Sequence, residues 1–190
     1  MGNEKASEIL LVTRRVMMER GYNGFSFRDV AAGVGIKSAS IHYHFPTKAD
    51  LAEAVAKDYR EWCLRALADL SAPDATALLT AYGNLFVAMF KDTGSVCLGG
   101  VLATDAASLP PSVKAEVERF FLGHHEWLSA VLQTGQKNGE IRPDLDPIAF
   151  ARTFVSSMEG AMMVSRATGN PHHLTETIDQ LVHLVRPLSR

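Results

Sequence analysis

The chain has 190 residues, of which 47% are hydrophobic and 21% are charged, and its formal net charge is −2. This composition excludes a disordered chain, and the apolar runs fall far short of the ~20 residues that cross a bilayer. Only two cysteines occur, Cys63 and Cys97, which excludes a disulfide framework and favours a reducing compartment. The N-terminus lacks a basic stretch followed by an apolar one, so we expect no signal peptide, no membrane association and a cytoplasmic location.

The charge is divided unevenly along the chain. Residues 1–50 contain seven lysines and arginines against five acids, a net charge of +2, which leaves −4 for the remainder. A mildly basic head on an acidic body is compatible with nucleic-acid binding by the head.

Three short helices are predicted within the first 50 residues. Apolar residues at three-to-four spacing predict a helix over residues 4–20, which Gly21 ends. Ser26 and Asp29 make a capping box that opens a second helix, which is expected to end near residue 33. After the turn GVGI, Ser38 is expected to cap a third helix of about seven residues.

A longer helix follows the third one. Pro46 ends the third helix, because the residue before a proline disfavours helical geometry. Thr47 and Asp50 then make a second capping box, and the apolar positions predict a helix over residues 48–70.

The third helix is too short to be stable alone. Ile41 and Phe45, four residues apart, would dock it on the core. A short helix after a tight turn is the arrangement of the helix-turn-helix motif, whose second helix lies in the major groove of DNA. The residues expected to face outward are Lys37, Ser38, Ala39, Ser40 and His42.

Residues 9–51 resemble the DNA-binding domain of the TetR family of bacterial transcriptional regulators. The resemblance is carried by GYNGFSFRDVAAGVGI and SASIHYHFPTKADL, with Tyr43, Phe45 and Lys48 in the family's order. It implies an all-α fold, with a three-helix helix-turn-helix DNA-binding domain over residues 1–50. A helical ligand-binding and dimerisation domain would then cover residues 51–190. Lys37, Ala39 and His42 depart from the residues commonest in the family, so no operator sequence is implied.

The side chains suggest different roles on DNA. Lys48, at the first turn of its helix, and the Tyr43 hydroxyl suit phosphate contacts, which the resemblance also implies. Lys37 and His42 either reach base edges or stay solvated, and Thr47 either contacts phosphate or only caps its helix. Arg28 either contacts the DNA backbone or pairs with a carboxylate. The predicted DNA-contact set is Ser26, Arg28, Lys37, Ser38, Ala39, Ser40, His42, Tyr43, His44, Thr47 and Lys48.

The rest of the chain is predicted to be helical, without internal repeats. Asp-Pro and Asn-Pro pairs supply caps for the last two helices, and KDTGSVCLGG is expected to be a flexible break. The predicted helices cover residues 73–91, a short stretch up to 108, residues 110–139, 147–168 and 171–186.

This body is expected to bind a small apolar or amphiphilic inducer. Its aromatic and sulfur-containing side chains either line an apolar cavity or pack as ordinary core. Cys97 adds an alternative function, a thiol-based electrophile sensor, because a few members of the resembling family sense electrophiles. An inert buried thiol is the other interpretation, since reactivity needs exposure and a lowered pKa. The predicted pocket residues are Tyr82, Phe86, Phe90, Cys97, Trp127, Phe154 and Met158.

The last two helices are expected to form a homodimer interface. Small residues and methionines alternate in FVSSMEGAMMVS, and IDQLVHLV is apolar. In the resembling family these helices pair with those of a second subunit, and a symmetric dimer reads two half-sites. Internal core packing is the alternative. The predicted interface residues are Ser157, Gly160, Ala161, Ile178, Leu181, Val182 and Val185.

Two histidine pairs, at 124–125 and 172–173, invite a metal site. Adjacent helical residues point about 100° apart, so neither pair chelates an ion alone, and we expect no metal and no cofactor. The chain contains no G-x-S-x-G, P-loop, G-x-G-x-x-G or H-E-x-x-H motif. A DNA-binding repressor that is not an enzyme is therefore the prediction, with a helical enzyme or an interaction module as rivals.

Overall fold

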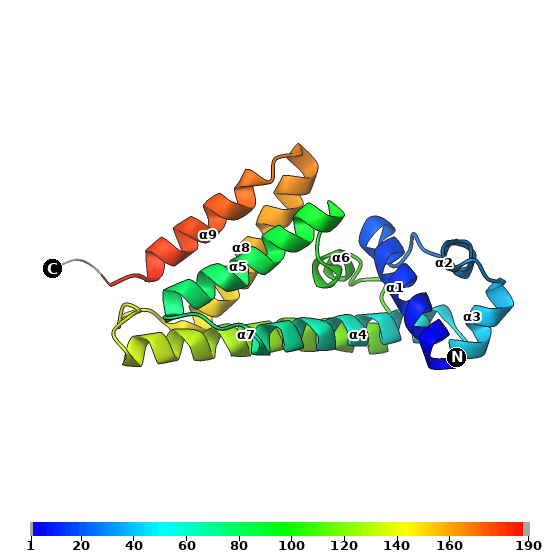
Figure 1. The fold of residues 1–190 in the computed structure, drawn as a ribbon, viewed down its shortest axis with the longest axis horizontal. Helices are drawn as coiled ribbons and strands as arrows, with labels where there is room; N and C mark the ends of the chain where they lie inside the picture. The colour runs from blue at the N-terminus through cyan, green and yellow to red at the C-terminus, as the bar shows by residue number, and fades with distance from the viewer. Residues whose placement is uncertain (1, 188–190) are drawn as a thin grey trace. The chain divides into compact units, whose positions relative to one another are not determined.

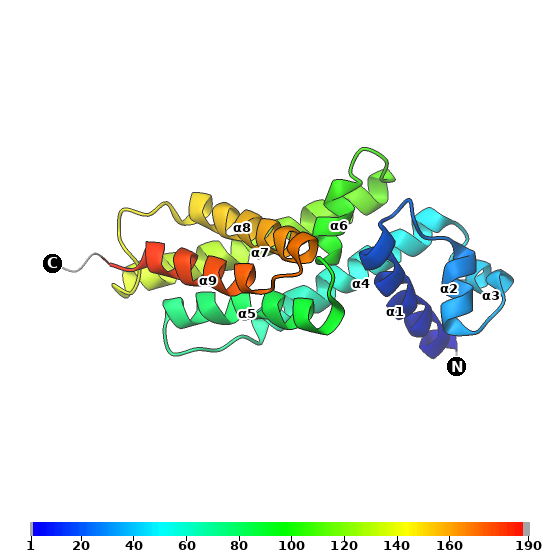
Figure 2. The ribbon, with the colours of Figure 1, turned by 90° about the horizontal axis from the view of Figure 1, so that it is seen from above.

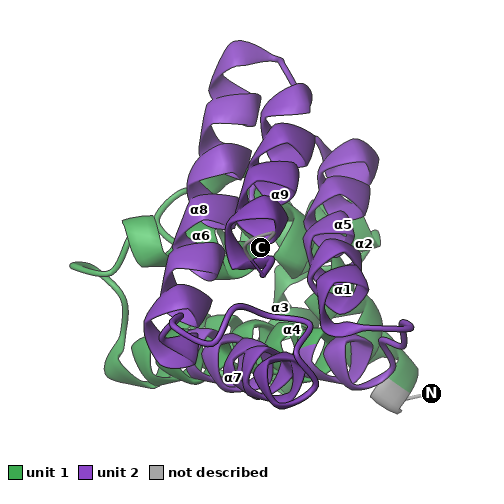
Figure 3. Cartoon of the chain, turned by 90° about the vertical axis from the view of Figure 1, so that its left-hand side faces the viewer, with its two compact units in different colours: residues 1–63, 98–120 green, residues 64–97, 121–190 purple. Residues whose placement is uncertain are grey.

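The structure is a computed structural model that describes residues 2–187. Within that range the secondary structure consists of nine α-helices and no strand (Figure 1). The predicted all-α class is therefore confirmed. The chain divides into two compact units, residues 1–63 with 98–120 and residues 64–97 with 121–190 (Figure 3).

Unit 1 contains the N-terminal helices together with a helix from the middle of the chain. Its centre is fully apolar: Ile9, Met17, Val30, Ile41 and Leu51 are completely buried. Its elements are α1 (Gly2–Arg20), α2 (Phe27–Val34), α3 (Ser38–His44), most of α4 (Lys48–Ala68), α6 (Leu98–Thr104) and the start of α7 (Pro111–Lys137).

Unit 2 is built on helices that pack side by side (Figure 2). Helix α9 lies against both α5 and α8, and the approach to α5 is close. A Cβ atom added to Gly83 of α5 would lie 2.5 Å from the Ile178 side chain of α9, so a larger residue there would force Ile178 or the helices to shift. The unit contains α5 (Ala75–Thr93), α8 (Pro147–Thr168), α9 (His172–Val185), the end of α4 and the larger part of α7.

The predicted capping boxes are confirmed. The Ser26 hydroxyl accepts a hydrogen bond from the Asp29 amide at 3.3 Å, and the Asp29 carboxylate accepts one from the Ser26 amide at 2.9 Å. Thr47 and Asp50 make the same reciprocal pair, at 3.1 and 2.9 Å. Gly35 ends α2 in the left-handed conformation, with φ of 72°. These local hydrogen bonds set the angles at which α2 and α4 begin.

Several expected helix boundaries differ from those in the structure: α6 ends at Thr104 rather than near residue 108, α5 ends at Thr93 rather than near residue 91, and α7 ends at Lys137 rather than at residue 139. Ser38 is the first residue of α3, and Lys37 takes the cap position without a side-chain hydrogen bond. Helix α9 begins at His172, whose amide donates to the Asn170 side chain at 3.0 Å. Helix α4 ends at Ala68 rather than at residue 70.

The segment around Cys97 also differs from the flexible break expected of it. Gly94 caps α5 with φ of 63°, and the next three residues, Ser95, Val96 and Cys97, are buried before α6 begins. The glycines of the sequence suggested mobility, whereas the burial of Ser95, Val96 and Cys97 fixes the segment.

Candidate DNA-binding surface and ligand-domain core

Helix α3 is held on unit 1 by a single buried side chain. Ile41 is fully buried, and the Phe45 amide closes the helix by donating to the Ile41 carbonyl at 2.8 Å. Most of the remaining surface of α3 is free: Ala39, Ser40 and His42 are exposed, as is Lys37 before it, whereas Ser38 is half-buried. The structure thus presents a short polar helix face, as the sequence predicted.

His42 is exposed but oriented. Its ring centroid lies 4.4 Å from that of Phe27, and its Nδ1 is 3.1 Å from the Pro46 carbonyl oxygen. A carbonyl can only accept, so this contact favours the tautomer with a proton on Nδ1. The Nε2 atom is then left as an acceptor.

Tyr43 and His44 form the C-terminal end of the α3 surface. Tyr43 is 85% exposed, and its ring meets the half-buried His44 edge-on, with centroids 5.2 Å apart. An aromatic side chain this exposed contributes little to the core, so its hydroxyl is available to a partner outside the chain.

Lys48, the first residue of α4, lies over two aromatic rings. Its Nζ is 4.8 Å from the centroid of Tyr22 and 4.6 Å from that of Phe25. Partial burial lowers the pKa of Lys48, and the carboxylates of Asp105 and Asp29 oppose that shift. The rings hold the ammonium group at the start of α4 by cation–π attraction.

The remaining predicted contact residues lie in the caps of α2 and α4. The hydroxyl of Thr47 donates to the Asp50 carboxylate at 2.8 Å, so the capping role is the one observed. Ser26 is engaged in the same way with Asp29. Arg28 is exposed, and the ion pair on the Asp29 carboxylate comes from Arg20, at 3.4 Å.

Two contacts within unit 1 have no counterpart in the sequence patterns. The Tyr22 amide, in the turn between α1 and α2, donates to the Asp105 carboxylate at 2.7 Å. In the same turn, the Asn23 side chain donates to the Ser108 hydroxyl at 2.8 Å. The turn that leads into the helix-turn-helix is thereby tied to the residues after α6. No sequence motif identifies Asp105, because its partner is 83 residues away.

The core of unit 2 is an aromatic cluster around Tyr82. Its ring stacks on Trp127 with centroids 5.6 Å apart, and Phe86 and Phe154 lie at 5.3 and 5.5 Å. The Tyr82 hydroxyl and His124 Nδ1 are 2.9 Å apart. Burial, with a smaller effect from the neighbouring His125, lowers the pKa of His124 to about 4, so its ring is neutral at pH 7.

The predicted pocket residues are largely brought together here. Tyr82, Phe154 and Met158 are completely buried, Phe86 nearly so, and Phe90 is half-buried. Among the predicted residues, Trp127 also borders an open pocket of about 360 Å³ in this unit. The pocket's other walls come from residues that the sequence did not single out.

A buried acid accompanies Cys97. The Cys97 thiol donates to Glu159 Oε1 at 2.8 Å, and the two side chains are 1% and 7% exposed. Glu159 Oε2 has no hydrogen-bond partner among the described residues. Burial raises the pKa of Glu159 to about 7, and the bond from Cys97 opposes that shift. No local pattern in the sequence points to Glu159, because it lies 62 residues from Cys97.

The predicted interface residues fall into two groups. Ile178, Leu181, Val182 and Val185 are buried within the chain, because the apolar face of α9 packs on α5 and α8. The sequence left an interface and internal packing open for these four residues, and internal packing is what the single chain shows. Gly160 is exposed, Ser157 is half-buried and Ala161 is 7% exposed.

Residues 2–187 contain neither a candidate metal centre nor a single helix that could span a membrane. Within that range, no three His, Cys, Asp or Glu side chains are grouped as a metal site would require. No single described helix is long and apolar enough to span a membrane, and only α5 and α6 taken together as a bent pair pass that test.

Comparison with known proteins identifies the family. A model for bacterial regulatory proteins of the tetR family matches residues 9–55. A model for the tetracyclin repressor-like C-terminal domain matches residues 76–181, more than half of the chain. The chain belongs to the TetR family. The predicted resemblance is therefore confirmed, and the TetR match extends well beyond the helix-turn-helix that carried it.

Relatives and solved structures agree with this assignment. The repressor DhaR of Mycobacterium sp. (strain GP1) is 25% identical over 90% of this chain and 85% of its own length. The repressor KstR2 of Mycobacterium tuberculosis is 28% identical over 76% of this chain and 72% of its own. A TetR-family regulator from Agrobacterium tumefaciens has 30% identity and a TM-score of 0.93, covering 98% of this chain and 100% of that one. The protein is a ligand-responsive, DNA-binding transcriptional regulator of the TetR family.

Proposed function

We propose that the protein is a homodimeric repressor that binds an operator through residues 1–50 and leaves it when a small molecule binds within residues 51–190. The observation that carries this proposal is the exposed face of α3, flanked by the exposed Tyr43 and the oriented Lys48. Such a regulator works where the chromosome is, so the cytoplasm is its proposed location. Repression is supported by the names of the relatives DhaR and KstR2.

The contacts to DNA divide by chemistry. We assign Lys48 and Tyr43 to phosphates, because an ammonium group at a helix start and an exposed phenol both suit phosphate oxygens. Lys37 and His42 are assigned to base edges. With Nδ1 turned to the Pro46 carbonyl, His42 presents Nε2 as an acceptor, which suits the amino groups of adenine or cytosine. The smaller residues Ser38, Ala39 and Ser40 let α3 approach the groove closely, with Ser26, Arg28, His44 and Thr47 at its margin.

A dimer interface is proposed on the outer face of α8 and α9. Gly160 is exposed there, and a Cβ added to it would meet nothing within 4 Å in the single chain. Met163, Val164 and Leu184 are large apolar side chains that remain exposed on the same two helices. Exposed apolar side chains beside a small residue are what a closely packed helix pair requires.

The electrophile-sensor alternative is not favoured. Thiol reactivity requires exposure and a group that stabilises the thiolate, whereas Cys97 is 1% exposed and donates to a carboxylate.

Operator binding is tested through its salt dependence. Sites are first selected from random duplexes, and affinity is then measured by fluorescence anisotropy at several salt concentrations. Replacing Lys48 with Gln is expected to weaken binding to all duplexes about equally and to lower the salt slope by about one charge. Lys91→Gln, at an exposed position of α5, is the matched control and should leave the slope unchanged. An unchanged slope for Lys48→Gln would remove Lys48 from the phosphate contacts.

The base contacts need a different readout, which is repeated selection with the variants. Lys37→Ala or His42→Ala should change the selected consensus and cost about 1–3 kcal/mol on the original site. Recovery of the same consensus with both variants would show that neither side chain reads a base.

A further inference from the structure

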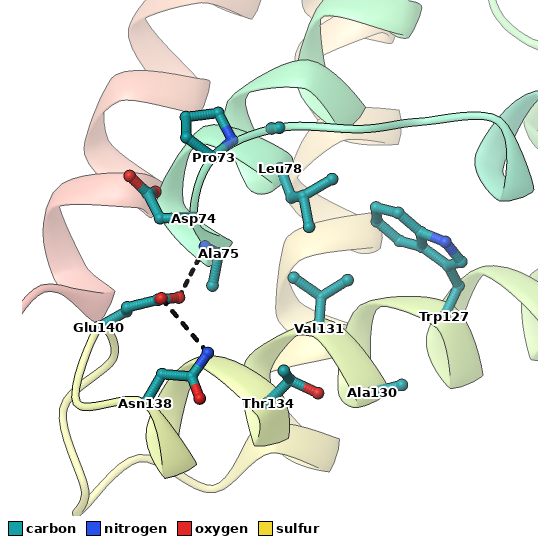
Figure 4. A pocket seen from close by; sticks show the side chains of 11 residues that line it. Pro73, Asp74, Ala75, Leu78, Trp127, Ala130, Val131, Thr134, Asn138 and Glu140 are labelled. Atoms are coloured by element: carbon teal, nitrogen blue, oxygen red, sulfur yellow. Dashed lines mark hydrogen bonds between the residues drawn. The ribbon is translucent and has the colours of Figure 1, made fainter.

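Unit 2 has a pocket of about 360 Å³ between the segment leading into α5 and the second half of α7 (Figure 4). This volume lies near the lower end of the range for small-molecule sites, about 300–1,000 Å³. It suits a ligand of one ring and a short chain. The pocket is distinct from the packed aromatic cluster, with which it shares only the indole of Trp127 among the side chains described for both.

One end of the pocket is apolar. The side chains of Leu78 and Val131 point toward each other across it, and Trp127 lies beside them (Figure 4). The indole is already oriented, because it stacks on Tyr82 with an interplanar angle of 20°. A preoriented aromatic wall opposite two branched aliphatic side chains favours a flat or short apolar group.

The other end of the pocket is acidic. The Glu140 carboxylate accepts from the Ala75 amide at 2.9 Å and from the Asn138 side chain at 3.3 Å, so its position is fixed (Figure 4). A carboxylate has about four acceptor positions, so two hydrogen bonds leave room for a ligand donor. Asp74, the cap of α5, also borders the pocket, but its carboxylate points away from Leu78 and Val131 (Figure 4), and hydrogen bonds from Thr76 and Ala77 keep its pKa low.

The charges of the lining are one-sided. It contains two carboxylates and, among the described residues, no lysine, arginine or histidine. Arg186 lies outside the lining and lowers the pKa of Asp74 by its charge. An anionic ligand would be repelled here, and a cation would be attracted.

We propose that this pocket binds a small amphiphilic cation, with its apolar body against Trp127, Leu78 and Val131 and its ammonium group at Glu140. The proposal that the pocket binds this cation is based on the geometry of unit 2. The further claim that this pocket is the inducer site rests on the proposed function. The indole that walls the pocket also stacks on Tyr82, which contacts His124. A ligand that contacts Trp127 therefore touches a side chain that packs directly against the core of unit 2.

The site is tested with three probes of one shape: phenylpropylamine, phenylpropanol and phenylpropanoate. The readout is the fluorescence of Trp127 in the full chain carrying Trp62→Phe, an aromatic replacement at a position that is 48% exposed. We expect the amine to bind best, the alcohol about fivefold more weakly, as for about 1 kcal/mol of charge attraction, and the acid more weakly still. Equal affinity for the amine and the acid, or no response to any probe, would overturn the proposal.

Two variants separate charge from shape. Glu140→Gln keeps the size and an acceptor for the Ala75 amide, so it should abolish the preference for the amine while the alcohol still binds. Ala130→Phe should fill the pocket and stop all binding. The control is Gln133→Phe, an exposed position on the same helix outside the lining, which should bind all probes as before. A preference that survives Glu140→Gln would show that Glu140 does not hold the ammonium group.

Operator affinity measured with and without the amine separates this proposal from the proposed function. If the amine binds at Trp127 and operator affinity falls, both stand. If the amine binds and operator affinity is unchanged, the pocket stands and its role as inducer site fails. If operator DNA binds but no probe does, the proposal for the pocket fails and DNA binding stands.

Discussion

The proposed DNA-binding surface of unit 1 and the core of unit 2 place their polar residues in opposite ways. In unit 1 the side chains proposed to contact DNA lie on the surface, around a helix whose only fully buried side chain is Ile41. In unit 2 the notable polar residues, His124 and Glu159, are buried in the core. The DNA-contact surface of unit 1 depends on which face of a single helix is apolar. The buried polar pairs of unit 2 depend on contacts between residues that are far apart in the sequence.

Burial shifts the pKa values of Glu159 and His124 in unit 2. It raises the pKa of Glu159 to about 7 and lowers that of His124 to about 4. Both groups are therefore favoured in their neutral forms, and each contributes to the pH dependence of stability. The two contributions have opposite directions, so one variant can separate them.

The largest expected effect is that of Glu159→Gln on stability at alkaline pH. In the unfolded chain Glu159 loses its proton near its ordinary pKa of 4.5, whereas in the folded chain it keeps it until about pH 7. The contribution of Glu159 to the free energy of unfolding of the wild type therefore falls by up to about 3 kcal/mol as pH rises from 4.5 to 7. This contribution stays low above pH 7. Gln carries no charge and retains an oxygen for Cys97. The variant should be more stable than wild type at pH 8 and no different at pH 4.

Urea unfolding at a series of pH values measures this difference. His124 supplies an internal control, because its neutral folded form loses stability as pH falls from 6.5 to 4. Glu159→Gln should leave that acid-side loss intact. If the variant and the wild type have parallel stability curves from pH 4 to 8, Glu159 is not a buried acid with a raised pKa.

A smaller effect is expected from the next residue on the same helix, which points outward. Gly160→Leu places its side chain in open space in the single chain, and leucine favours a helix over glycine by up to about 1 kcal/mol. In a dimer packed on this face the extra atoms would cost about 1–3 kcal/mol. The isolated fold should therefore survive while association weakens.

Light scattering at several protein concentrations measures the association. The wild type should have the mass of two chains, and Gly160→Leu should separate into single chains at higher concentrations than the wild type does. Wild-type particles of one chain throughout the range, or a variant that associates as tightly as the wild type, would contradict the proposed interface.

Much of unit 1 could be predicted from the sequence, because its determinants are local. Each capping box joins residues three apart, and Ile41 and Phe45 are four apart. The cap of α3 was misplaced because Ser38 has the right side chain, yet the turn leaves Lys37 in the cap position. Propensity ranks residues for a position, but the preceding turn decides which residue occupies it.

Unit 2 could be predicted only in outline. Apolar spacing indicated its helices, but it did not show which partner covers each apolar face. The apolar residues of α9 fit an interface or a core equally well, and contact with α5 and α8 decided for the core. Glu159 and the acidic end of the pocket depend on pairs that are far apart in sequence, which no local pattern reveals.

The smallest expected effect concerns Asp105, which breaks the rule that unit 1 is determined locally. Its carboxylate accepts the Tyr22 amide at 2.7 Å and raises the pKa of Lys48 against the effect of burial. Asp105→Asn keeps an acceptor for that amide and removes the charge. Hydrogen bonds to charged groups contribute about 1 kcal/mol more than neutral ones, so a loss of about 1 kcal/mol in unfolding free energy is expected.

Two measurements show whether this contact also positions Lys48. Amide NMR should show the Tyr22 resonance shifted in Asp105→Asn, and operator affinity should fall even though Asp105 is not among the proposed DNA contacts. The control is Ser108→Ala, which removes the acceptor of the Asn23 side chain in the same turn but leaves the charge near Lys48 in place. If both variants weaken operator binding equally, the turn matters only as a tether. If Asp105→Asn alone does so, its charge is what holds Lys48 ready for phosphate, and a residue after α6 then contributes directly to DNA affinity.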